Sequence, residues 1–334
     1  MPAASLPGTT DRRIDALLTL LSDNPLIVIS GQKIAKEIGV SRSAVWQWTQ
    51  RLRSLGVKVK GHPRTGYSIE RVPDVLSPSL LRRQLHSSMF GRRIHHFFKA
   101  GSTNAIAFDL GRAGEPHGAV VLAEEQSAGR GRAGRAWHSE KTSGIYVTVL
   151  LRPAISPLVA PLITMLAGLA VRDAVLAETD LAPDLRWPND LLMAGKKFCG
   201  ILTEMDAEPD RVHFVIVGIG VDVNHAQMPK ELAAHATSLH MVTGKTYSRL
   251  QILVRLLRYL ETYYNQFLAS GPQPILARFG ETSSFARGKR VRISTTAETY
   301  SGTTDGLEPN GLLRVRRDDG RLAIVTSGDV AEAN

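Results

Sequence analysis

Three patterns of apolar and polar positions follow one another along the chain. Near the N-terminus, Ile14, Leu17, Leu18 and Leu21 recur at the spacing of one helical face. The middle of the chain alternates short continuous apolar runs, typical of buried strands, with long apolar helices. From Gly288 onward, short stretches alternate apolar and polar residues between Gly, Asp and Asn turns. The pattern predicts a small helical domain, a larger mixed domain and a small all-β domain.

The N-terminal pattern predicts a winged helix. Two helices are expected at 30–38 and 41–54, each opened by a capping serine and separated by Gly39. Short helices joined by a few residues that include Gly form a helix-turn-helix. Segments 57–60 and 66–69 then favour a hairpin. One helix, a helix-turn-helix and a hairpin follow in the order of a winged helix.

The middle region predicts both strands and helices. Its expected helices are 78–85, 101–110, 157–178, 248–268 and 274–284, and its expected strands are 94–98, 120–125, 144–151, 185–190, 198–204 and 212–221. Residues 222–247 lack periodicity, so we expect a mobile loop with one short helix, a candidate lid. Further strands are expected at 290–294, 298–302, 311–315 and 321–325.

The predicted fold class is α+β multidomain. Residues 1–72 are expected to form an N-terminal winged helix-turn-helix domain, residues 73–284 a central α/β domain with a mixed sheet, and residues 285–334 a small C-terminal β-barrel. Prolines within 72–78 indicate the first boundary, and the change of composition near Gly288 indicates the second.

Composition narrows the class of protein. The 334 residues are 43% hydrophobic and 22% charged, as in ordinary globular proteins. Cys199 is the only cysteine, which excludes an intrachain disulfide framework and a Cys-based zinc site, and the sequence identifies no set of metal ligands. We expect no window apolar enough to span a bilayer and no signal peptide. A cytoplasmic protein without a membrane partner is therefore expected.

Net positive charge is concentrated in the N-terminal part of the chain. Residues 1–72 hold eleven Lys and Arg against five Asp and Glu, a net charge of +6 out of +10. One face of the helix at 41–54 is polar, and the hairpin carries further basic residues. These candidate DNA contacts are Arg42, Ser43, Trp46, Gln47 and Gln50 for the major groove, and Lys58, Lys60 and Arg64 for phosphates. The alternative is a helical domain that binds protein instead.

The run from Gln126 to Ser139 is the strongest chemical signal. Gly129, Gly131 and Gly134 alternate with Arg130, Arg132 and Arg135, with no acidic residue among them, between two predicted core strands. Glycine permits close approach of the backbone, and arginine binds carboxylate and phosphate. The run predicts an anion site, against the alternative of a solvated basic loop. It is not a Walker A loop, because no Gly-Lys-Ser/Thr closes it.

Two other motifs are weak when taken alone. Ser102, Thr103 and Asn104 open a predicted helix, where polar side chains can bind a ligand or simply cap the helix. Lys196 and Lys197 stand at the entrance of a strand, where a lysine is either solvated or an anion clamp.

Five motifs together carry a family resemblance. They are Ser102-Thr-Asn104, Gly129-Arg-Gly-Arg-Ala-Gly-Arg135, Arg186-Trp-Pro-Asn-Asp190, Lys197-Phe-Cys-Gly-Ile-Leu202 and Gly218-Ile-Gly-Val-Asp-Val-Asn224. In this order the chain resembles the bifunctional biotin–protein ligases that also repress biotin operons, over nearly its whole length. The resemblance implies a ligase domain of the class II aminoacyl-synthetase and biotin-ligase fold, followed by an SH3-like barrel.

The resemblance also implies a reaction and its participants. ATP and biotin would form biotinyl-5′-AMP with Mg²⁺ shielding the phosphates, and biotin would pass to a lysine of the biotin carboxyl carrier protein of acetyl-CoA carboxylase. The adenylate would act as corepressor, driving a homodimer along a sheet edge onto palindromic operator DNA. The segment 221–235 would cover the adenylate.

Site residues follow from the matched motifs. Catalytic roles are implied for Lys197, Arg132 and Arg130. Biotin contacts are implied for Ser102, Thr103, Asn104, Gln126, Arg130, Gly131, Arg132 and Lys197. Nucleotide contacts are implied for Arg135, Trp137, Asn189, Asp190 and Asn224.

Five positions depart from the family pattern: Ala133, Glu140, Arg186, Cys199 and Asp222. Glu140 stands where proline is usual, and Asp222, where asparagine is usual, adds a negative charge near the expected nucleotide.

Three other functions stay open at this point. One is a lipoate–protein ligase of the same superfamily, and another is an anion-sensing transcription factor without ligase activity. The third is a ligase whose winged helix no longer represses, since Trp46 is a large aromatic residue on the DNA face.

Overall fold

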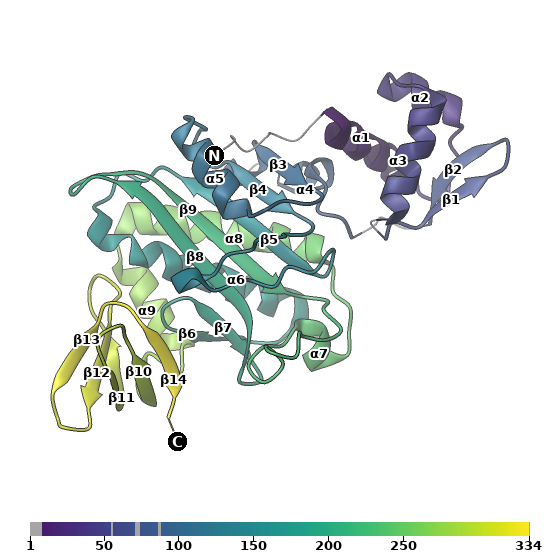
Figure 1. Cartoon of the computed structure of the whole chain (residues 1–334). Coiled ribbons are helices and arrows are strands. Elements are labelled where there is room, and N and C mark those ends of the chain that lie inside the picture. Colours follow the sequence, from purple (N-terminus) through teal and green to yellow (C-terminus); the bar gives the residue numbers. More distant parts are fainter. Residues whose placement is uncertain (1–8, 55, 71–73, 86–87, 334) are drawn as a thin grey trace.

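The computed structural model describes residues 9–54, 56–70, 74–85 and 88–333. The chain forms a large central domain with a small domain at either end (Figure 1). The expected boundary at residues 72 and 73 lies outside the described residues, as does the segment 1–8. The second expected boundary, at 284 and 285, falls between the last helix and the first strand of the C-terminal sheet.

The N-terminal domain has the predicted winged-helix order. Its elements are α1 (Thr9–Asp23), α2 (Gly31–Ile38), α3 (Arg42–Ser54), β1 (Val59–His62) and β2 (Gly66–Ile69). Ser30 Oγ accepts from Lys33 N at 3.1 Å at the start of α2, and Gly39 ends that helix with φ 72°. Apolar residues of all three helices and both strands form one core, which Val75 and Phe98 from beyond the winged helix also join.

The central domain is built on one seven-stranded mixed sheet. Its strands are β3 (Ile94–Phe97), β4 (Val120–Ala123), β5 (Gly144–Leu151), β6 (Asp184–Arg186), β7 (Asp190–Met193), β8 (Lys196–Ala207) and β9 (Val212–Asp222). They lie in the order β3-β4-β5-β9-β8-β7-β6, and only β3 and β4 run parallel. The long antiparallel pair β8–β9 lies near the middle of the sheet.

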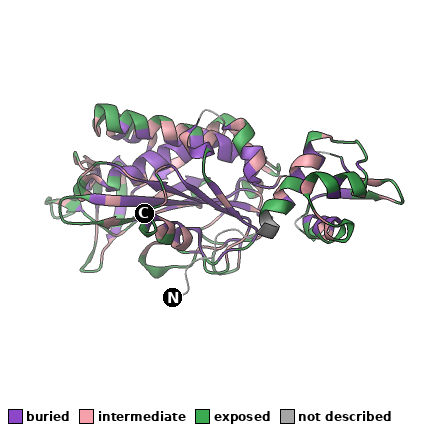
Figure 2. Ribbon diagram, turned by 90° about the horizontal axis from the view of Figure 1, so that it is seen from above, coloured by how far each residue is buried: buried purple, intermediate pink, exposed green. Residues whose placement is uncertain are grey.

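Helices cover both faces of this sheet (Figure 2). They are α4 (Pro78–Gln84), α5 (Thr103–Arg112), α6 (Pro161–Thr179), α7 (Leu239–Thr243), α8 (Arg249–Ser270) and α9 (Gln273–Thr282), with short 3₁₀ turns η1 (Met89–Gly91), η2 (Arg132–Gly134) and η3 (Pro157–Val159). Helices α6 and α8 pack in the main core on one face. Helix α5 packs on the other face, where Ala107 contacts a smaller cluster that includes Phe214.

Helix α6 contradicts the expectation that no segment of the chain is apolar enough to span a bilayer. Segment Pro157–Thr179 is long and apolar enough to cross a membrane by length and composition, although the sequence reading expected no such window. However, 72% of that window is buried inside the protein, so the helix is buried core. Continuous apolar sequence here reflects packing between the sheet and α8.

The linker after the winged helix is fastened to the central domain by a buried ion cluster. Arg249, at the start of α8, is fully buried, and its guanidinium lies 2.8 Å from Glu124 Oε2 and 3.0 Å from Asp74 Oδ2. Leu76 N donates to Glu124 Oε1 at 2.7 Å. Burial alone would raise the pKa of Glu124, but Arg249 and the hydrogen-bonded His96 lower it to about 2.

The C-terminal domain is an antiparallel sheet of five strands. They are β10 (Arg287–Ser294), β11 (Thr299–Leu307), β12 (Leu313–Arg317), β13 (Leu322–Val325) and β14 (Asp329–Glu332), in the order β13-β12-β11-β10-β14. The sequence reading expected only four strands. It missed β14 because this strand has four residues, of which one is buried, so it lacks a readable alternation.

Candidate active site

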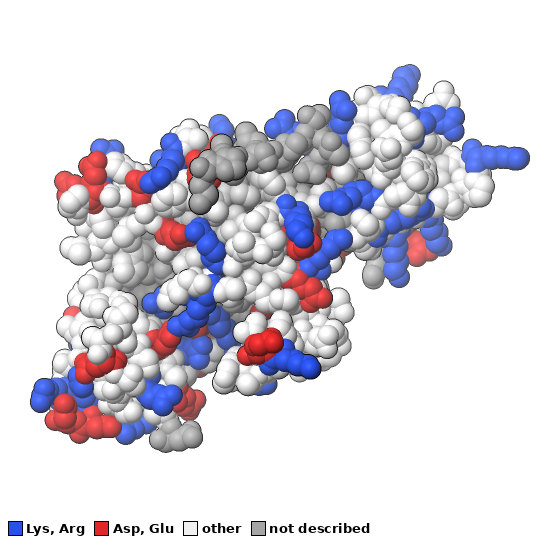
Figure 3. Space-filling model, in the orientation of Figure 1, with Lys and Arg blue, Asp and Glu red and all other residues white. Residues whose placement is uncertain are grey.

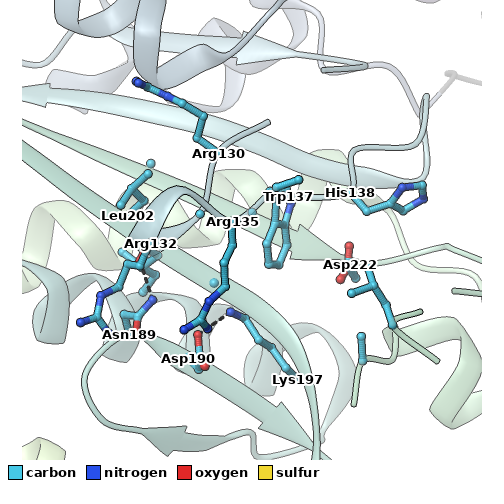
Figure 4. Close-up of a pocket in the computed structure, with 18 of the residues that line it drawn as sticks. Arg130, Arg132, Arg135, Trp137, His138, Asn189, Asp190, Lys197, Leu202 and Asp222 are labelled. Carbon is cyan, nitrogen blue, oxygen red and sulfur yellow. Dashed lines mark hydrogen bonds and ion pairs between the residues drawn. The ribbon is translucent and has the colours of Figure 1, made fainter. Parts of the chain in front are cut away.

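A cavity of about 440 Å³ lies on the sheet face opposite α6 and α8 (Figure 4). Its wall is formed by the start of α5, the segment from Gln126 to His138, strands β7, β8 and β9, and residues 228–236. The space-filling view shows Lys and Arg side chains around the hollow between the central and C-terminal domains (Figure 3). The cavity therefore suits an anionic ligand.

The glycine–arginine loop, residues 129–135, is ordered by backbone hydrogen bonds of its own. Gly131 N donates to Arg135 O at 2.7 Å, and Trp137 N donates to Gly129 O at 2.9 Å. Between these bonds, Ala133 takes a left-handed conformation with φ 54°. The loop is thus a folded hairpin whose Arg132 and Arg135 point into the cavity, whereas Arg130 points away from them and pairs with Glu204 at 3.3 Å (Figure 4).

Two glycines of β9 make room for the loop and for α5. A Cβ on Gly220 would lie 2.4 Å from the Trp137 ring, and a Cβ on Gly218 would lie 1.9 Å from Asn104 Oδ1. Any side chain there would displace its neighbour. The Gly218-Ile-Gly220 motif therefore serves close packing at the cavity wall.

The polar side of the cavity is a connected hydrogen-bond network. Gln126 Oε1 accepts from Thr103 N at 2.8 Å and from its hydroxyl at 3.1 Å. Asn104 Nδ2 donates to Glu204 Oε2 at 2.7 Å, and its Oδ1 accepts from the buried Thr148 hydroxyl at 2.7 Å. These bonds fix the side chains that open α5 in orientations set before any ligand binds.

The opposite side of the cavity is cationic. Lys197 Nζ lies 2.6 Å from Asp190 Oδ1, and Arg186 lies 2.7 Å from the other oxygen of that carboxylate. Arg132 donates to Asn189 Oδ1 at 2.9 Å, as Figure 4 shows. Burial lowers the pKa of Arg132, which nevertheless stays a cation. Positive charge is thus held in fixed positions facing the cavity.

The C-terminal domain also reaches this loop. Arg135 is ion-paired with Asp329 of β14, and Arg132 donates to Gly328 O at 3.5 Å. Asp329 itself lines the cavity. The strand missed by the sequence reading therefore contributes to the site.

The segment between β9 and α7 covers part of the cavity. Lys197 N donates to His235 O at 2.9 Å, and Thr237 N donates to Lys197 O at 2.9 Å. Met228 and Leu232 add apolar side chains to the lining. The expected short helix is present as α7, whereas the expected mobility of the segment is an untested prediction.

One end of the cavity holds buried groups without partners. Asp222 is 6% exposed, and its Oδ1 accepts no hydrogen bond among the described residues. Burial raises the pKa of Asp222 well above its usual range, which Lys197 offsets only in part. Burial, with the charges of His138 and Arg249, lowers the pKa of His225 to about 4.

The structure brings nearly all predicted site residues together. Those lining the cavity are Ser102, Thr103, Asn104, Gln126, Arg130, Gly131, Arg132, Arg135, Trp137, Asn189, Asp190 and Lys197. Asn224 is not among the described residues of the lining, because its amide is bonded to the backbone of Tyr247 at 2.8 and 3.0 Å. His138, His235 and Asp329 line the cavity without having been predicted.

The predicted DNA face is largely exposed. Arg42, Ser43, Trp46 and Gln47 are exposed on α3 and Gln50 is half-buried, whereas Val45, Trp48, Thr49 and Leu52 are buried on the other face. Lys58, Lys60 and Arg64 are exposed on or beside the hairpin, and Lys60 is ion-paired with Glu70. The winged-helix end of Figure 3 is accordingly rich in Lys and Arg.

Comparisons with known proteins agree with this architecture. Residues 12–68 match an HTH domain family, residues 100–222 the Biotin/lipoate A/B protein ligase family, and residues 287–331 the Biotin protein ligase C terminal domain family. The Bifunctional ligase/repressor BirA of Bacillus spizizenii is 37% identical over 316 residues, covering 94% of this chain and 97% of that protein.

Two further similar proteins are named as biotin ligases. The Biotin--[acetyl-CoA-carboxylase] ligase of Mycobacterium tuberculosis is 35% identical and covers 77% of this chain and 97% of that protein. The biotin protein ligase of Aquifex aeolicus, solved in complex with biotin and ATP, superposes with a TM-score of 0.63 at 26% identity, covering 72% of this chain and 100% of that one. The winged helix, the anion cavity and the full-length similarity together mean that this chain belongs to the family of bifunctional biotin ligase/repressors.

Proposed function

We propose that the chain joins biotin to ATP as biotinyl-5′-adenylate, transfers biotin to a lysine of a carrier protein, and represses biotin genes when the adenylate is bound. One observation carries the proposal. Residues from four distant segments, 102–104, 126–137, 189–190 and 197, line one cavity with fixed hydrogen bonds and fixed positive charge. Bringing two anions together requires such a site.

The first step needs charge stabilisation rather than covalent catalysis by the protein. A carboxylate oxygen of biotin attacks the α-phosphorus of ATP, and pyrophosphate leaves. Lys197, Arg132 and Arg130 are the proposed catalytic residues, because their cations stabilise the charge that develops on the phosphorus oxygens. Lys197 must exchange its 2.6 Å contact with Asp190 for a substrate oxygen.

Biotin is proposed to bind on the side where α5 begins. The proposed contacts are Ser102, Thr103, Asn104, Gln126, Arg130, Gly131, Arg132 and Lys197. The nucleotide is proposed to contact Arg135, Trp137, Asn189 and Asp190, and Asn224 is left out because it lies off the cavity.

Mg²⁺ is proposed as the counter-ion of the ATP phosphates. A hard cation takes oxygen ligands, and Asp190 is the carboxylate proposed to supply one, in exchange for its present ion pairs with Lys197 and Arg186. When bound, Mg²⁺ would shield the phosphate charge.

In the second step, the carrier lysine amine attacks the carbonyl carbon of the adenylate, AMP leaves and the amine loses a proton. Until then, water must be kept from the anhydride. The Trp137 ring, which packs on Gly220, and the covering segment 224–238 are proposed to exclude it.

Partners and location are proposed with the activity. The carrier is the biotin carboxyl carrier protein of acetyl-CoA carboxylase, and the operator DNA is bound by a homodimer that forms along a sheet edge when adenylate is present. Strands β3 and β6 form the edges of the seven-stranded sheet. We place the protein in the cytoplasm, where these partners occur.

The ligase is tested by pyrophosphate release from biotin and ATP, with wild type and Lys197→Ala. The variant should release pyrophosphate orders of magnitude more slowly while unfolding at a similar urea concentration. Equal release by both proteins would remove Lys197 from the mechanism. In a separate assay with a carrier protein, isotope-labelled biotin and lipoate compete for transfer, and preferential transfer of lipoate would replace biotin ligase with the lipoate alternative.

Repression is tested by a gel shift on biotin-gene promoters, with and without biotin plus ATP. Retardation only with both ligands supports adenylate-dependent repression. Absence of retardation, alongside normal biotin transfer, would leave a ligase whose winged helix has another role.

A further inference from the structure

Three side chains of types that can bind a metal gather at the end of the cavity that His138 and Asp222 line. His138, Glu140 and His225 each present one donor atom, and these atoms all lie within 4.8 Å of one another. His138 and Glu140 directly follow the glycine–arginine loop, while His225 begins the covering segment. The cluster therefore joins two parts of the chain that both border the cavity.

Unpartnered buried groups single this cluster out. His225 is fully buried, and its Nδ1 has no hydrogen-bond partner among the described residues. Its other nitrogen lies 3.2 Å from the Tyr146 hydroxyl and 3.6 Å from Asp222 Oδ1, which also lacks a hydrogen bond. A buried polar atom without a partner is costly unless something compensates it. A cation bound at Nδ1 would compensate that nitrogen, and its charge would favour the nearby Asp222 carboxylate.

The donor types indicate the class of ion. Two imidazoles and one carboxylate suit Zn²⁺ and similar divalent transition metals, whereas Mg²⁺ prefers oxygen ligands. Ligands about 2.0 to 2.2 Å from a metal lie closer together than 4.8 Å, so only a small side-chain movement is needed. Glu140 is exposed and can make that movement.

We propose that His138, Glu140 and His225 form a binding site for Zn²⁺ or a similar divalent transition metal, with Asp222 as a neighbouring carboxylate. Bound metal ties the end of the glycine–arginine loop to the start of the covering segment. The site is separate from the Mg²⁺ that accompanies ATP, and it does not depend on the proposed ligase activity. Glu140 and Asp222, two of the departures from the family pattern, thereby acquire a shared explanation.

The test uses the full chain without an affinity tag, stripped of metal by a chelator. Zn²⁺ is titrated calorimetrically in excess Mg²⁺, and Co²⁺ is titrated with its visible absorption as a second readout. We compare wild type, His138→Ala and Glu140→Gln, an isosteric change at an exposed position. His213→Ala is the matched control, since the side chain of this histidine is partly exposed and lies 3.3 Å from the exposed carboxylate of Glu208.

Wild type and His213→Ala should each bind one equivalent of Zn²⁺, with a midpoint of thermal unfolding that rises with Zn²⁺ concentration. His138→Ala and Glu140→Gln should bind at least tenfold more weakly and lose the tetrahedral Co²⁺ bands. Less than one equivalent in wild type, or unchanged affinity in His138→Ala, would overturn the proposal.

Discussion

Replacing Glu124 by Gln should destabilise the protein at neutral pH through charge alone, because the two side chains have nearly the same size. Burial would keep this carboxyl neutral, yet Arg249 and His96 lower its pKa from 4.5 to about 2. A difference of roughly 2.5 pH units at about 1.4 kcal/mol per unit gives about 3–4 kcal/mol of stability at pH 7. The variant should lose that amount, since Arg249 stays fully buried with only Asp74 as its charged partner.

The pH dependence distinguishes this explanation from simple disruption of packing. The folded-state pKa lies below the unfolded value, so the unfolded chain binds the proton first. The stabilisation is complete above pH 4.5 and fades as the pH falls toward 2. Urea unfolding followed by tryptophan fluorescence at pH 7, 5 and 4 should show the gap between wild type and variant narrowing at the lowest pH.

Glu125→Gln is the matched control, because the neighbouring carboxylate pairs with Lys99 at the surface, where such a pair contributes about 0–1 kcal/mol. A gap for Glu124→Gln that is the same at pH 7 and pH 4, or no larger than that of the control, would refute the reasoning.

Three further changes test other parts of the molecule. Arg132→Gly should let the adenylate escape and label lysines of unrelated proteins, and tight retention of adenylate would contradict this role. Gly218→Ala should lower the stability by about 1–3 kcal/mol, since the new Cβ would lie 1.9 Å from Asn104 Oδ1, and an unchanged unfolding midpoint would count against the close packing. Lys58→Ala should weaken DNA binding on all sequences alike and reduce the salt slope by about 1, whereas Gln47→Ala should alter sequence preference with the slope unchanged; gel shifts at several salt concentrations measure both.

Local sequence was sufficient to predict a structural element where the residues that determine it lie close together in the chain. The serine caps and Gly39 predicted the helix-turn-helix, because it depends on residues close in the chain. The alternation of Gly and Arg predicts an anion site, and anion binding by that loop stays a prediction. The biotin and nucleotide residues came from the family resemblance, and the fold explains why their distant segments share a cavity.

Contacts between distant segments could not be predicted in this way. Strand β7 was missed because it has four residues and turns into β8 at Ala194, a non-glycine residue with φ 50°. Asn224 is bonded to the backbone of Tyr247 and lies off the cavity, whereas Asp329 pairs with Arg135 and lines it. No local sequence pattern identifies either partner. The approach of His138 to His225 is likewise a property of the folded chain.

The hydrogen bonds between Lys197 and the covering segment link the position of this lysine to the position of the segment that covers the cavity. Its backbone N–H and C=O are both bonded to residues 235 and 237. Lifting that part of the segment would break both bonds, while the pairing of Leu192 with Lys197 between β7 and β8 would remain. We therefore expect the Lys197 ammonium to be less well positioned in an opened protein, so that ligand exchange and adenylate formation alternate in time.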